Sequence, residues 1–140
     1  MALLAVRVYL RGYGGMSPSS TSFFDLLSVT PDDGFEVRAS DNPRRSALLT
    51  LVEVAADDCL GAEEPSEEFA ARISSALMRA SAWLSDDREQ GLVQWRKQGN
   101  TADVFVDGWS DQNQLYLEFP PEFLLACGRL GLSIIICTGH

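Results

Sequence analysis

Residues 66–84, SEEFAARISSALMRASAWL, decide the fold. Apolar side chains recur there every three or four positions, which is the period of a helix with one buried face. Ser66 is a candidate N-cap, and Glu67 and Glu68 place carboxylates at the positive end of the helix dipole. Because an apolar face must be buried against another layer, we expect this helix to pack on a sheet. The apolar positions are Phe69, Ile73, Ala76, Leu77, Ala80, Trp83 and Leu84.

Strand patterns precede this helix. Residues 3–10, 35–39 and 46–55 are rich in strand-forming side chains and predict three strands, the last of them buried. The glycine-rich stretch at 12–15 is expected to break the first strand. A short helix is expected after this break, with its apolar face formed by Phe23, Phe24, Leu26 and Leu27.

The sequence after the long helix predicts more strands. Residues 92–97, 103–109 and 114–119 are separated by short polar turns, which indicates an antiparallel meander. Residues 133–138, SIIICT, are strongly apolar and predict a strand in the centre of the sheet.

A third helix is expected between the meander and the last strand. Pro120 and Pro121 suit its start, where an N–H has no helical partner, and Gly131 suits its end. Its inner face is predicted to hold Phe123, Leu124, Cys127 and Leu130.

These elements predict a single α+β domain over residues 1–140. We expect a mixed, mainly antiparallel sheet with about three helices packed mostly on one face. The composition, 46% hydrophobic and 22% charged, is ordinary for a globular protein.

The charge balance limits the classes of partner. Twenty acidic residues against eleven basic ones give a net charge of −9. This field repels nucleic acids and anionic membranes and attracts basic proteins, so we expect a basic protein partner. Three cysteines without a C-x-x-C spacing predict reduced thiols in the cytoplasm, and no apolar run reaches the roughly 18 residues of a membrane span.

Carboxylates are the abundant polar groups. The segment 57–68 contains six acidic residues and no basic one, which predicts either a solvated loop or a docking surface for a basic protein. Asp103, Asp107 and Asp111 are spaced by four; the first two share one face of a strand, and we expect them to be solvated. With Trp109 as an aromatic anchor, the predicted partner-binding residues are Asp57, Asp58, Glu63, Glu64, Glu67, Glu68, Asp103, Asp107, Asp111 and Trp109.

Patterns for catalysis or for a cofactor are weak. His140 is the single histidine and the last residue, so no Ser-His-Asp or Cys-His arrangement can be built around it. The glycine-rich loop matches no phosphate-binding motif, and the cysteines have no zinc spacing. We therefore expect a protein that is not an enzyme and has no cofactor or metal.

Two strings carry a resemblance. VRVYLRG (6–12) followed by SPSSTSFFDLLSVTP (17–31), and LEFPPEFLLACGRLGLSIIICT (117–138), together resemble a family of small bacterial domains of unknown function. Some such domains are similar in size and acidity to immunity proteins of polymorphic toxin systems. The resemblance covers the two ends of the chain, about a third of it. It implies an inhibitor of a toxin and transfers no catalytic residue.

Three hypotheses follow. The first is an immunity or inhibitor protein that occludes the active or substrate-binding surface of a basic toxin. The second is an enzyme or sensor with a small-molecule pocket near residues 12–20 and the carboxylates of Asp103 and Asp107. The third is a homo-oligomeric module, such as a homodimer, in which residues 134–136 and exposed tryptophans pack against another copy.

Overall fold

The computed structural model describes residues 4–14, 21–39, 47–55, 67–110 and 117–139. These residues form five strands and four helices in the order β1-α1-β2-β3-α2-α3-β4-α4-β5, with one short 3₁₀ turn, η1 (Pro31–Asp33), before β2. The strands are β1 (Leu4–Gly14), β2 (Glu36–Ala39), β3 (Ala47–Ala55), β4 (Asn100–Ser110) and β5 (Ser133–Gly139). The helices are α1 (Thr21–Leu26), α2 (Glu67–Ser85), α3 (Glu89–Lys97) and α4 (Pro121–Arg129).

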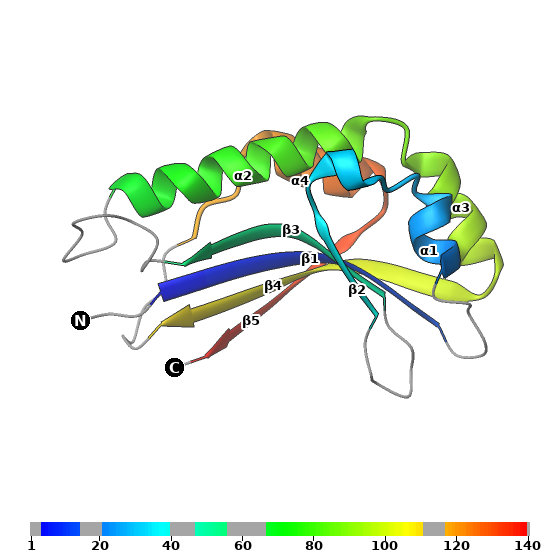
Figure 1. Cartoon of the computed structure of the whole chain (residues 1–140), viewed down its shortest axis with the longest axis horizontal. Coiled ribbons are helices and arrows are strands. Elements are labelled where there is room, and N and C mark those ends of the chain that lie inside the picture. The colour runs from blue at the N-terminus through cyan, green and yellow to red at the C-terminus, as the bar shows by residue number, and fades with distance from the viewer. Residues whose placement is uncertain (1–3, 15–20, 40–46, 56–66, 111–116, 140) are drawn as a thin grey trace.

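The strands form one mixed sheet in the order β2-β3-β1-β4-β5. Neighbouring strands are antiparallel except β4 and β5, which are parallel. The helices lie on one side of this sheet (Figure 1). The predicted α+β class and mainly antiparallel sheet are therefore confirmed, with four helices where about three were expected.

The core lies between the sheet and the helices. Val6, Val8 and Leu10 of β1 are fully buried and alternate with polar side chains, as expected for a strand with one covered face. The pairing of β1 with β3 shifts register between Val8 and Tyr9, which leaves Leu51 without an opposite residue. This bulge accounts for the burial of two consecutive side chains, Leu51 and Val52, because the inward alternation restarts after the extra residue.

Helix α2 confirms the prediction made from its period. Phe69, Ile73, Leu77 and Leu84 are buried, and the helix packs against β3 and α4. Trp83 near its C-terminal end is buried too. Its ring packs edge-on against the ring of Phe35, with 5.4 Å between the two ring centres.

The predicted strand at residues 92–97 is wrong, because these residues belong to α3. Leu92 and Trp95 are buried at a spacing of three, which is a helical period. Glu89 in the first turn and Arg96 and Lys97 in the last turn complement the helix dipole. The meander is therefore wrong as well: β4 contains the predicted strand 103–109, residues 117–120 form no strand, and residues 114–116 lie outside the described part.

The prediction that the glycine-rich stretch 12–15 breaks the first strand is wrong at Gly12, because β1 continues through this residue to Gly14. A Cβ on Gly12 would lie 2.5 Å from the ring of Phe23. This glycine therefore lets α1 approach the strand closely, where sequence reasoning expected it to end the strand.

The last strand is at an edge of the sheet, where the sequence predicted a central position. Only β4 pairs with β5 among the described strands, and Ile135 and Ile136 are 40% and 57% exposed. Helix α4 has the predicted start and end: Gly131 has φ +67°, and the N–H of Leu132 donates to the carbonyl of Cys127 at 2.9 Å. Leu124, expected on its inner face, is 48% exposed.

Candidate partner-binding face

The helices leave the second face of the sheet uncovered (Figure 1). We call it the open face. Side chains on it alternate with the buried valines and leucines of the core, and cross-strand register assigns positions of neighbouring strands to the same side. The positions of the open face include Glu36 and Arg38 on β2, Leu48, Thr50 and Glu53 on β3, Arg7, Tyr9, Arg11 and Tyr13 on β1, Asp103, Phe105 and Asp107 on β4, and Ile135 and Cys137 on β5.

A cluster of three polar side chains occupies one end of this face. The Nε and Nη2 atoms of Arg11 donate to the two carboxylate oxygens of Asp103 at 2.9 and 2.8 Å. The hydroxyl of Tyr13 donates to the same carboxylate at 2.9 Å. The guanidinium of Arg11 also lies over the rings of Phe105 and Tyr13, at 4.7 and 5.1 Å from their centres. The cluster therefore ties β1 to β4 through two-pronged, charge-assisted hydrogen bonds.

Burial makes Asp103 the anchor of this cluster. The side chain of Asp103 is 4% exposed and that of Arg11 is 27% exposed. Hydrogen bonding to Asp103 is the main cause that raises the pKa of Arg11 above its ordinary value. The expectation that Asp103 is solvated is therefore wrong: Arg11 and Tyr13 complete its hydrogen bonding, which makes burial of the charge tolerable.

Asp107 shares the open face with Asp103, as predicted, yet the two carboxylates do not converge. Four residues along one strand span about 13 Å. This separation exceeds the reach of two groups that act on one reacting centre, so Asp103 and Asp107 do not form a pair of carboxylates for acid–base chemistry. Asp107 is half-buried beside Tyr9, whose pKa is raised, chiefly by burial.

Exposed ion pairs cover the rest of the open face. Arg7 lies 3.4 Å from Glu53, and Arg38 lies 3.0 Å from Glu36. Together with the buried pair they match three cations to three carboxylates, and Asp107 is in excess. No salt bridge to Asp107 forms among the residues described. Counted over its described residues, the open face therefore presents one extra negative charge beside half-buried aromatic rings.

Strand alternation also places the position of Trp109 on this face, two residues after Asp107. The described part of the chain places none of the other predicted site residues there. Asp57, Asp58, Glu63, Glu64 and Asp111 lie outside the described residues, as does His140. Glu67 begins α2, and Trp109 belongs to β4 in register with Ala5, but the side chains of both are outside the description. Glu68 forms an ion pair with Arg72 at 3.0 Å.

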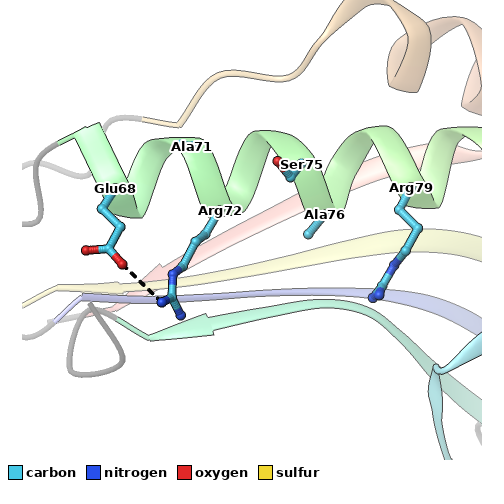
Figure 2. Close-up of a pocket in the computed structure, with 6 residues that line it drawn as sticks. All are labelled: Glu68, Ala71, Arg72, Ser75, Ala76 and Arg79. Carbon is cyan, nitrogen blue, oxygen red and sulfur yellow. Dashed lines mark hydrogen bonds and ion pairs between the residues drawn. The ribbon is translucent and has the colours of Figure 1, made fainter. Parts of the chain in front are cut away.

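A groove of about 430 Å³ runs along α2, away from the open face (Figure 2). Arg72 and Arg79 extend from the helix toward the sheet in this view, and Arg79 lies 5.3 Å from the centre of the Phe35 ring. Two cations against the single carboxylate of Glu68 do not suit a basic partner, so we do not place the predicted interface here. The lining residues are Glu68, Ala71, Arg72, Ser75, Ala76 and Arg79.

Sequence reasoning did not predict the structural roles of Arg11, Tyr13 and Arg88. The first two were detectable, because the strand alternation of residues 6–10 continues to residue 13 if Gly12 is accepted as a strand residue. Arg88 is buried between two helix ends: its guanidinium donates to the carbonyls of Leu27 and Trp83 at 2.8 and 3.1 Å. No pattern in the sequence marks such a cation, because both of its acceptors are backbone atoms.

The two described cysteines differ in environment, and this predicts their reactivity. Burial raises the pKa of the Cys127 thiol to about 11, whereas Cys137 is exposed on β5. At pH 8 Cys127 is therefore protonated as well as inaccessible. We expect iodoacetamide to label Cys137 rapidly and Cys127 only after unfolding in urea, as read by peptide mass mapping. Equal labelling of both cysteines in the folded protein would contradict this assignment.

Searches for other sites and for relatives gave negative results. No group of three or more potential metal ligands occurs among the described residues. In the same part of the chain no helix combines the length and apolar character required to cross a membrane. Comparisons with protein-family models, curated proteins and solved structures found no match.

Proposed function

We propose that this chain is an acidic binding protein that captures a basic protein through the open face. The observation that carries the proposal is the uncovered sheet face, where Asp107 stands in excess over three matched ion pairs beside half-buried aromatic rings. Aromatic anchors in a preorganised setting are the groups that contribute most to protein interfaces. The net charge of −9 supports the same direction, because opposite charge accelerates encounter with a basic partner.

The most specific form of this proposal is an immunity or inhibitor protein of a bacterial toxin. It would act by covering the active or substrate-binding surface of the toxin, so no bond is made or broken. The resemblance of the two ends of the chain to small bacterial immunity-like domains supports this form. The basic surface of a nuclease-type toxin is the chemistry that an acidic inhibitor fits.

A growth-rescue experiment in cells that express the toxin tests the proposal. The basic toxin domain encoded beside this gene would be expressed from an inducible promoter, with and without the chain. We expect the chain to restore growth, and the variant Asp107→Lys to restore it less at equal expression. A neighbourhood without a basic toxin gene, or growth arrest that the chain does not relieve, would contradict the proposal.

The acidic segment before α2 is expected to act on the rate of encounter. Changing Asp57, Asp58, Glu63 and Glu64 to lysine alters the net charge from −9 to −1. We expect slower association with the toxin and a weaker dependence of the association rate on NaCl concentration, measured by stopped-flow fluorescence. Changing the same residues to asparagine and glutamine should give an intermediate rate. Association as fast as that of the wild type would show that this segment does not attract the partner.

A further inference from the structure

The two edges of the sheet are built differently. The β2 edge has four residues and carries the ion pair between Arg38 and Glu36. The β5 edge has seven residues, SIIICTG, with no charge, no proline and no bulge. Natural sheets protect their edges with short strands, charges and bulges, because an unprotected edge offers free backbone groups to another strand. Among the described residues, the first edge is protected in this way and the second is not.

The β5 edge exposes apolar side chains toward both sides of the sheet. Ile134 and Ile136 are in parallel register with the core residues Val104 and Val106, whereas Ile135 is in register with Phe105 of the open face. Ile136 nevertheless has 57% of its surface exposed and Ile135 has 40%. A strand added beside β5 would bury apolar surface on both sides at once, in addition to satisfying backbone groups.

We infer that β5 pairs with β5 of a second copy of this chain, so that two sheets join edge to edge in a symmetric dimer. An antiparallel two-fold pairing centred on Ile135 sets the isoleucines of the two copies opposite one another, and cross-strand pairs of branched apolar residues are favourable. The uncharged edge also favours a copy over a charged partner strand, because residues 133–139 offer no charge for such a partner to match. The edge itself adds no charged side chain to the contact, and the repulsion between the two chains arises from their net charge of −9 each.

This dimer is independent of the proposed function. Edge pairing extends the sheet and leaves the open face uncovered in both copies. The two associations also respond oppositely to salt: screening weakens the capture of a basic partner and strengthens the contact between two acidic copies. Failure of one proposal is therefore distinguishable from failure of the other.

Sedimentation velocity of the full chain over a range of concentrations tests the inference. We expect a monomer–dimer equilibrium that shifts toward the dimer when NaCl is raised. Ile136→Lys should raise the dissociation constant by about tenfold or more, whereas Val37→Lys, the same kind of change at the β2 edge where Val37 is 50% exposed, should leave it unchanged. A second measurement needs no variant: amide hydrogen exchange in β5 should slow as the concentration of wild-type protein rises.

A wild-type protein that stays monomeric at all concentrations would overturn the inference. So would a dimer that Val37→Lys disrupts and Ile136→Lys does not, because the β2 edge would then be the contact. Concentration-independent exchange in β5 would overturn it even if the Ile136→Lys variant failed to fold.

Discussion

Asp103→Ala is expected to destabilise the protein by about 3 kcal/mol, because it breaks a buried charge pair on one side. The carboxylate of Asp103 accepts two hydrogen bonds from Arg11 and one from Tyr13, and its side chain is 4% exposed. Removing it leaves a guanidinium and a hydroxyl that water reaches poorly. Urea unfolding followed by the fluorescence of the buried Trp83 and Trp95 measures this loss.

The matched control is Glu53→Ala. Its ion pair with Arg7 also joins β1 to a neighbouring strand, but both side chains are about half exposed, at 55% and 47%. We expect a loss below about 1 kcal/mol, since exposed ion pairs contribute little. The double change Arg11→Met with Asp103→Leu should recover part of the stability, because it removes both charges together. If Asp103→Ala is no more destabilising than Glu53→Ala, the cluster of Arg11, Tyr13 and Asp103 does not stabilise the pairing of β1 with β4 as proposed.

Gly91→Ala is expected to destabilise the protein by about 2 kcal/mol, although alanine is the better helix former. Gly91 is buried in α3, and a Cβ there would lie 2.1 Å from the carbonyl oxygen of Leu26. The atom in the way belongs to the backbone at the end of α1, so α1 and α3 must move apart to admit a methyl group. Thermal and urea unfolding both report this loss.

Gly128→Ala is the control for this effect. Gly128 is exposed in α4, and a Cβ there would meet nothing within 4 Å. The same substitution should stabilise the protein by about 0.5 to 1 kcal/mol, because it lowers the conformational entropy of the unfolded chain. Opposite signs at the two glycines are the expected result. A stabilising effect of Gly91→Ala would mean that α1 and α3 are not in contact as described.

The sequence predicted elements well where one pattern persists over many residues. Helix α2 repeats its apolar spacing over nineteen residues, so its period is unambiguous. Helix α3 has nine residues, and a short apolar run of that kind does not separate helix from strand. Gly12 misled for a different reason: its role is to admit the ring of Phe23, which belongs to an element that sequence reasoning cannot place in space.

The sequence patterns did not predict the order of the strands in the sheet. A strand, a proline-started helix and an apolar strand follow one another over residues 100–139, which is the pattern of a parallel β-α-β unit. The high apolar content of residues 133–138 predicts a central strand, whereas β5 lies at an edge of the sheet. Burial of Asp103 depends on this order too, because its partner Arg11 lies 92 residues away in the chain.

The candidate site was therefore predictable in part. Strand alternation places Asp103 and Asp107 on one face, and the structure confirms that placement. Their different roles follow from neighbours on other strands: Asp103 faces Arg11 and Tyr13, whereas Arg7, opposite Asp107 in register, pairs with Glu53. Sequence spacing alone cannot distinguish a buried anchor from an available carboxylate.

The most direct test of the central claim compares two charge reversals on opposite sides of the sheet. Asp107→Lys changes the open face, whereas Asp86→Lys makes the same change in charge at the exposed turn after α2, on the helical side. Binding kinetics with the basic toxin domain proposed as the partner would be measured by surface plasmon resonance. We expect both variants to slow association to a similar extent and Asp107→Lys alone to speed dissociation by about tenfold or more. Equal dissociation rates for the two variants would show that the open face is not where the partner binds.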